Sequence, residues 1–238
     1  MNWPVFFIAA LVAVTTACGP RNPVDERVIP PSRIVNFSLL YARNCSGCHG
    51  PDGKGGAAIG IGDPIYLAIA DDVTIRRVTS GGVAGTSMPA FAQRSGGMLT
   101  EDQIDVITHG IRTRWAKPDV LRGVALPPYS VPGLGDPRHG AIVYDTHCSA
   151  CHGATGLGGK RASSIVDGSY LAIVSDQNLR TTVIVGRPEL AAPDWRGNVA
   201  GRPMSPEDIS DVVAWLAAQR PQFPGQPYSS VRLRGGIR

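Results

Sequence analysis

Apolar residues recur at helical spacing in four stretches of the chain, and these stretches form two similar pairs. In the first half the pattern covers residues 32–45 and 100–115, and in the second half it covers 140–147 and 205–216. Segments rich in glycine or proline separate the stretches. The pattern therefore predicts a helix near each end of a unit that occurs twice.

Local signals sharpen this prediction. Thr100 opens a capping box, and Ser205 is an N-cap residue followed by a proline at the first helical position. Shorter helical segments are expected at residues 66–70 and 73–78, and residues 170–174 repeat the first of them. The two units thus share the same order of elements.

The repeat divides the chain into two domains, which we expect at residues 32–116 and 138–221. Residues 117–137 between them are rich in proline, so they form a linker that is semi-rigid or lies along both domains. Residues 222–238 form a basic tail.

The beginning of the chain has the features of an export signal. An apolar run within residues 1–18 has the length of a signal-peptide core and is too short to span a bilayer comfortably. The small residues before Cys18 resemble a bacterial lipoprotein box, which predicts lipid attachment at Cys18; an uncleaved anchor or a plain signal peptide is the alternative. Residues 19–31 would then be a tether between membrane and domain.

Two short motifs carry the chemistry. Residues 45–49 read C-S-G-C-H and residues 148–152 read C-S-A-C-H, and both are followed by a glycine-rich loop. The C-x-x-C-H sequence is the attachment signal for c-type haem. On a helical turn its two thiols face one porphyrin edge, and the histidine lies beside them.

Other uses of these cysteines explain the pattern less well. A disulfide framework gives no reason for a histidine directly after each pair. A zinc site would need the two pairs to converge and would leave both histidines without a role. A thioredoxin-like redox pair needs a neighbouring strand–helix–strand pattern, which we do not find.

Composition supports a buried cofactor. The 238 residues include 29 Gly and 20 Pro with only 6% aromatic residues, which is modest material for two apolar cores. The formal net charge of +4 would be offset by haem propionates, so it indicates little about partners. No part resembles a nucleophile–base set, a phosphate-binding loop or a nucleic-acid-binding surface.

From about Ser32 to Arg220 the order of elements resembles class I cytochromes c: helix, C-x-x-C-H, glycine-rich loop, short helices, Met-Pro loop and capped last helix. The chain is similar to a tandem di-haem member of that family. The resemblance implies an all-α fold of two small domains, each wrapped around a covalent haem, with the first and last helices crossing beside the haem edge.

The resemblance also implies which residues hold two covalently bound haem c groups. The attachment cysteines would be Cys45, Cys48, Cys148 and Cys151, and the proximal iron ligands would be His49 and His152. The second nitrogen of a proximal imidazole needs a hydrogen-bond partner, which we expect to be a backbone carbonyl of the glycine-rich loop near Pro64. The second loop has no matching proline.

The sixth ligand of the first iron is predicted to be Met88. It lies in a loop beside Pro89, where the family's ligand lies. Iron held by His and Met is the usual electron-transfer arrangement, because the thioether raises the potential and both axial positions are filled.

The second domain departs from this pattern, because alignment of the halves places Ala192 opposite Met88 and alanine cannot bind iron. We expect Met204 to be the second sixth ligand. Its alternative role is a hydrophobic staple at the start of the last helix. In that case a histidine, such as His139 or His147, or an open position takes the sixth site.

These features predict an exported, lipid-anchored electron carrier on the periplasmic side of a bacterial membrane. Its partners would be redox proteins: a quinol-oxidising complex or dehydrogenase as donor, and an oxidase, reductase, reaction centre or other cytochrome as acceptor. The alternative is a peroxidase-like haem enzyme or ligand sensor with an open second haem, for which Arg187, Arg196 and Arg202 lie near Ala192 in sequence.

Overall fold

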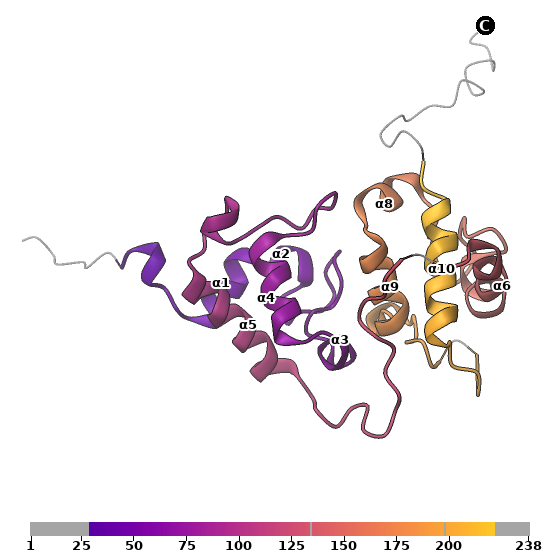
Figure 1. Ribbon diagram of the computed structural model, residues 1–238, viewed down its shortest axis with the longest axis horizontal. Helices are drawn as coiled ribbons and strands as arrows, with labels where there is room; N and C mark the ends of the chain where they lie inside the picture. Colours follow the sequence, from indigo (N-terminus) through magenta and orange to yellow (C-terminus); the bar gives the residue numbers. More distant parts are fainter. Residues whose placement is uncertain (1–28, 134, 198, 222–238) are drawn as a thin grey trace, which may run out of the picture.

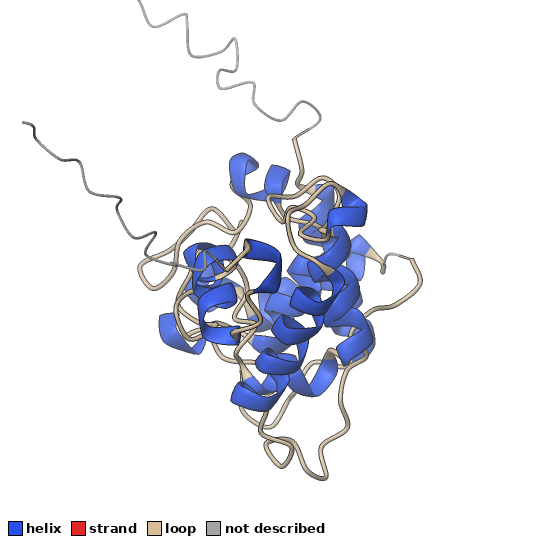
Figure 2. Cartoon of the chain, turned by 90° about the vertical axis from the view of Figure 1, so that its left-hand side faces the viewer, coloured by secondary structure: helices blue, strands red, loops and turns tan. Residues whose placement is uncertain are grey.

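The structure is a computed structural model that describes residues 29–133, 135–197 and 199–221. Within these ranges the regular elements are helices, and the only extended pairings are isolated bridges. Figure 1 shows two helical lobes, the first coloured indigo to magenta and the second rose through orange to yellow. In the view of Figure 2 the helices are connected by loops throughout. The all-α prediction is confirmed.

The two lobes have the same order of helices. The first contains α1 (Phe37–Asn44), α2 (Ser46–His49), α3 (Pro64–Ile69), α4 (Asp72–Gly81) and α5 (Glu101–Trp115), with 3-10 turns at Pro31–Arg33 and Gln93–Ser95. The second contains α6 (Pro137–His147), α7 (Ser149–His152), α8 (Gly168–Ile173), α9 (Asp176–Val185) and α10 (Pro206–Ala218), with a 3-10 turn at Pro188–Leu190.

Capping residues set the helix limits. The expected helix start near Ser32 is wrong, because the side chain of Asn36 accepts a hydrogen bond from the Leu39 amide and so starts α1 at Phe37. Both long helices carry complete capping boxes, at Thr100 for α5 and at Ser205 for α10. α6 begins earlier than expected, at Pro137, because Asp136 caps it.

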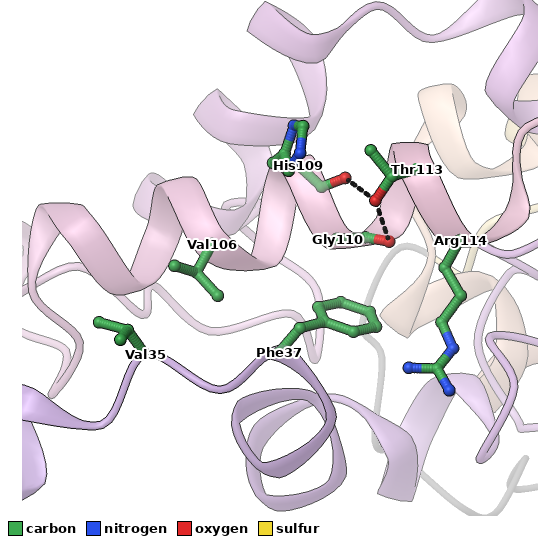
Figure 3. A pocket seen from close by; sticks show the side chains of 7 residues that line it. All are labelled: Val35, Phe37, Val106, His109, Gly110, Thr113 and Arg114. Carbon is green, nitrogen blue, oxygen red and sulfur yellow. Dashed lines mark hydrogen bonds between the residues drawn. The ribbon is translucent and has the colours of Figure 1, made fainter.

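The first and last helices of each lobe cross closely because one of them carries a glycine at the crossing. In the first lobe a Cβ on Gly110 of α5 would lie 2.1 Å from the ring of Phe37 on α1, and Figure 3 shows that ring facing Gly110. In the second lobe the glycine is on the other helix: a Cβ on Gly140 of α6 would lie 1.9 Å from the Asp211 carbonyl and 2.9 Å from Cβ of Trp215 on α10. The large aromatic side chain thus lies on the first helix in one lobe and on the last helix in the other, and the glycine lies on the opposite helix each time.

The linker lies against the second lobe. Its Pro128 carbonyl accepts hydrogen bonds from the Arg180 guanidinium on α9 at 3.0 and 3.1 Å. The next carbonyl, of Tyr129, accepts one from Gln177 at 2.7 Å, while the Tyr129 ring meets Tyr66 of α3 edge-on. The linker therefore touches both lobes, which agrees with the expected arrangement in which it lies along both domains.

The lobes also touch each other directly, with α3 facing α9 (Figure 1). Val185 of α9 belongs to the buried cluster of the first lobe, and Ile65 and Ile69 of α3 pack against the buried cluster of the second. Arg187 donates a hydrogen bond to the Gly56 carbonyl in the first glycine-rich loop at 2.7 Å.

The proposed signal segment, Cys18, most of the tether and the basic tail lie outside the described residues. In the part that the structure describes, none of the helices has the length and apolar character needed to cross a bilayer.

Stability should fall on going from mildly acidic to mildly alkaline pH, and His139 should cause part of this fall. The imidazole is hydrogen-bonded to Asp211 at 2.7 Å, and this bond, with the charges of Asp211, Asp208 and Asp136, raises the pKa of His139 above 6.5. A raised folded-state pKa stabilises the fold at pH below the unfolded value, and this contribution disappears as pH rises through the folded value. Urea unfolding of His139→Gln across this range should show a shallower slope than the wild type; equal slopes would contradict the prediction.

Candidate haem sites

Each C-x-x-C-H motif forms one helical turn directly after the first helix of its lobe. In the first lobe the amides of Cys48 and His49 both donate to the Cys45 carbonyl, at 3.2 and 3.0 Å. In the second lobe Cys151 and His152 bond to Cys148 in the same way, at 3.1 and 3.0 Å. The four cysteines are free thiols rather than disulfides, as thioether attachment requires. Their spacing on one turn fits the edge of one porphyrin per motif.

The first cysteine of each motif packs at the core of its lobe, and Cys148 is only partly buried there. Cys45 belongs to the buried cluster of the first lobe, whereas Cys48 is exposed. Burial, followed by the charge of the second cysteine, raises the pKa of the Cys45 thiol to about 11 and that of Cys148 to about 12.

The two motif histidines are oriented by loop carbonyls, as expected. Nδ1 of His49 lies 2.8 Å from the Ile59 carbonyl oxygen, and Nδ1 of His152 lies 2.8 Å from that of Ser163. A carbonyl partner makes Nδ1 the protonated nitrogen, so Nε2 keeps its lone pair for a metal. Burial lowers the pKa of His49, which favours the neutral, ligating form. The absence of a proline in the second loop does not disturb this arrangement.

The glycine-rich loops fold back tightly onto the motifs. A Cβ on Gly56 would lie 2.0 Å from the Cys48 carbonyl oxygen, and a Cβ on Gly159 would lie 2.8 Å from that of Cys151. The hydroxyl of Tyr41 on α1 donates to the Gly50 carbonyl at 2.8 Å. These contacts leave room for backbone only, so glycine is required where the loop passes the cysteines.

An arginine near the end of the last helix anchors the short helices in each lobe, a feature that the sequence reading missed. Arg112 donates to the carbonyls of Leu67 and Ala70 and pairs with Asp72 at 2.6 Å. In the second lobe Arg220 makes the same three kinds of contact, and its partners are Leu171, Val174 and Asp176.

The loop after α4 presents Met88, and the same place after α9 is taken by Ala192. Gly82 ends α4 with φ +67°, and a Cβ there would lie 2.7 Å from the Met88 carbonyl oxygen. Gly186 ends α9 with φ +71°, and a Cβ there would lie 2.7 Å from the Ala192 carbonyl oxygen. The structure therefore places Ala192 where Met88 stands in the first lobe.

Met204 lies elsewhere. Its amide donates to the Trp195 carbonyl at 3.0 Å, just before the N-cap Ser205. In the first lobe Leu99 precedes the N-cap Thr100, and its amide donates to the Phe91 carbonyl at 2.8 Å. Both side chains are buried, at 3% and 6% exposure. Met204 is thus the equivalent of Leu99, not of Met88.

Met88→Ala should remove the near-infrared Met-to-iron band of the first haem and lower its potential, because a thioether favours ferrous iron. The shift should be a clear fraction of the roughly 0.8 V range that axial ligands span. Met98, which is 82% exposed, offers the matched control Met98→Ala. A redox titration with near-infrared spectroscopy would contradict the ligand prediction if Met88→Ala behaved like this control.

The four motif cysteines do not meet in a shared metal site. Within the described ranges no group of three or more His, Cys, Asp or Glu side chains is placed to hold a metal ion. This speaks against the zinc alternative and leaves each motif as a separate site.

Comparison with known proteins identifies the family to which the sequence is similar. The family "Cytochrome C oxidase, cbb3-type, subunit III" matches the chain twice, over residues 36–113 and 135–216. The chain is 30% identical to the Cbb3-type cytochrome c oxidase subunit CcoP of Azospirillum sp. over 196 residues. The aligned region covers 76% of this chain and 54% of that protein. The chain thus spans about half the length of that relative.

Two further proteins are similar to the chain at lower sequence identity. The chain is 26% identical to the cytochrome bc1 complex cytochrome c subunit of Mycobacterium tuberculosis, covering 87% of this chain and 70% of that protein. A solved chain of the reducing HAO-like protein complex of Kuenenia stuttgartiensis has a TM-score of 0.44 at 15% identity, covering 78% of this chain and 96% of that chain. Because the twofold family match covers more than half of the sequence, the chain belongs to the cbb3-type cytochrome c oxidase subunit III family and is a cytochrome with two covalent haem c groups in tandem domains.

Proposed function

We propose that this chain is an exported, membrane-tethered relay that passes single electrons from a quinol-oxidising complex or dehydrogenase to an oxidase, reductase, reaction centre or other cytochrome. The observation that carries the proposal is the pairing of two motif sites in lobes that are packed together and bridged by Arg187 and the linker. Bound haem iron supplies one-electron chemistry by alternating between ferric and ferrous states.

The protein's own residues would fix the two sites rather than react. His49 and His152 would hold the iron from one side, each aligned by its loop carbonyl. Met88 would close the other side of the first site and keep its potential high. The packed linker would hold the lobes in one arrangement, so an electron that enters at one site has a fixed path to the other.

The partners are proposed from the relatives. One relative is named as a subunit of a cbb3-type oxidase and another as a subunit of a bc1 complex. Both names describe a subunit of a redox complex, which supports a donor or acceptor of that class here. Lipid attachment at Cys18 and a periplasmic location complete the proposal, and both rest on the sequence.

The test separates a free carrier from a subunit of a larger complex. Membranes containing the native protein would be solubilised mildly and resolved by blue-native electrophoresis with haem staining. We expect the haem-stained band to co-migrate with a quinol-oxidising or terminal complex, or to run alone near its own mass and be reoxidised when that complex is added. A reduced protein that no membrane complex reoxidises or reduces would overturn the proposal.

Lipid anchoring at Cys18 is tested separately. Cys18→Ser should release the protein from washed membranes while the haem content remains unchanged. Retention of the variant on membranes would contradict lipid anchoring at Cys18.

A further inference from the structure

We propose that the second haem site leaves the sixth position of its iron open to a small neutral ligand of the carbon monoxide or nitric oxide class. Ala192 stands at the place of Met88, as the matching contacts of Gly186 and Gly82 show. A methyl side chain has no donor atom for iron. The inference concerns this site alone and does not depend on which partner exchanges electrons with the protein.

Met204 does not replace the missing sulfur, because it has a different structural task. It is 3% exposed and belongs to the buried cluster that includes Trp195, Ile209 and Val212. In the first lobe Leu99 fills the equivalent place while Met88 stands separately in the loop. The place of Leu99 is therefore a core position of this fold and not the position of a sixth ligand.

Neither nearby histidine lies on the loop that carries Ala192, because both belong to α6. His139 is bonded to Asp211 at 2.7 Å on the outer side of the crossing of α6 and α10. His147 directly precedes Cys148, in the same helical run as His152. The Nδ1 atom of His147 is buried without a hydrogen-bond partner, but its ring is carried by the segment before the motif and not by the loop after α9, which corresponds to the Met88 loop of the first lobe.

The arginines beside Ala192 decide which ligand class fits. Arg187 is bonded to Glu189 and to the Gly56 carbonyl. Arg196 pairs with Asp194 at 2.7 Å and lies 4.9 Å above the Trp195 ring. Because the guanidinium groups of Arg187 and Arg196 are already engaged, they are not available to hold an anion or to polarise peroxide. The third arginine near Ala192 in sequence, Arg202, is exposed. This favours a neutral diatomic ligand and disfavours the peroxidase-like alternative.

The first experiment is a carbon monoxide titration of the dithionite-reduced holoprotein, combined with near-infrared spectra of the oxidised protein. We expect one carbon monoxide bound per chain and one Met-to-iron band. Two bands without carbon monoxide binding would overturn the proposal in favour of a sulfur ligand at the second iron. One band without carbon monoxide binding would overturn it in favour of a histidine.

Reciprocal variants provide the matched controls. Ala192→Met should abolish carbon monoxide binding and produce a second band, and Met88→Ala should raise the stoichiometry to two. Met204→Leu, which installs the residue of the first lobe, should still bind one carbon monoxide per chain. A Met204→Leu protein that gains a binding site absent from the wild type would overturn the proposal. Haem content and circular dichroism of each variant show that it is folded, and the wild-type titration decides the question even if a variant fails to fold.

Discussion

Replacing Gly56 by alanine is expected to leave the protein with a single attached haem. The new Cβ would lie 2.0 Å from the Cys48 carbonyl oxygen and 2.7 Å from the Gly50 amide, and both neighbours are backbone that cannot turn away. Overpacking typically costs about 1–3 kcal/mol, and a clash with rigid backbone belongs at the upper end of that range. The loop would have to leave the motif, so His49 would lose the Ile59 carbonyl that orients it. The ratio of haem to protein should fall from two to one.

The matched control is Gly47→Ala. Gly47 is exposed within the same motif, a Cβ there would meet nothing within 4 Å, and the second motif already has Ala150 at this position. Alanine is also the better helix former by about 1 kcal/mol. We expect Gly47→Ala to keep both haems with equal or slightly higher stability. If Gly56→Ala also kept two haems and an unchanged urea midpoint, the tight loop geometry would be refuted.

Replacing Arg112 by alanine is expected to destabilise the first lobe by about 2–4 kcal/mol, because two backbone carbonyls lose charge-assisted hydrogen bonds. The ion pair with Asp72 adds little, since that carboxylate is 59% exposed and well screened. In the wild type the hydrogen bonds from Arg112 to the Leu67 and Ala70 carbonyls hold the end of α3, which lies against the second lobe.

Urea denaturation followed by circular dichroism would measure this change. Arg43→Ala is the control, because Arg43 is exposed on α1, and it should shift stability by less than about 0.5 kcal/mol. Arg220→Ala should weaken the second lobe by a similar amount to Arg112→Ala. Equal stabilities of Arg112→Ala and Arg43→Ala would show that the anchoring contacts contribute nothing.

Much of the fold follows from local signals. The capping boxes at Thr100 and Ser205 start α5 and α10 where the sequence predicts, because a side chain and a backbone amide three residues apart satisfy each other. The loop carbonyl for the motif histidine could be anticipated because a ligating imidazole needs a partner for its second nitrogen. The start of α1 could not be placed, since Asn36 competes with the helical spacing that begins at Ile34.

The missed features depend on contacts between elements distant in sequence. When the last helices are aligned on their capping residues, Arg220 falls opposite Trp115, which is nearly one turn after Arg112. An alignment of the two halves therefore does not pair the two arginines, although they make the same contacts. Similarly, Phe37 and Gly110 are replaced by Gly140 and Trp215. In each lobe one helix supplies a large side chain and the other a glycine, but the helix that carries the glycine differs between the lobes. The combined volume at the crossing is therefore kept only when both helices are considered together.

The burial of Cys45 has a consequence for the order of events during biogenesis. In the closed fold this sulfur lies in the same cluster as Ile104 and Ile107 of α5, and burial raises the pKa of an unattached Cys45 thiol to about 11, so that it would stay protonated. A protonated, covered thiol is a poor partner for a porphyrin vinyl group and for any enzyme that delivers it. The covalent bonds must therefore form while the segment between the motif and α5 is still open. The first domain therefore closes around its cofactor only after the bonds have formed.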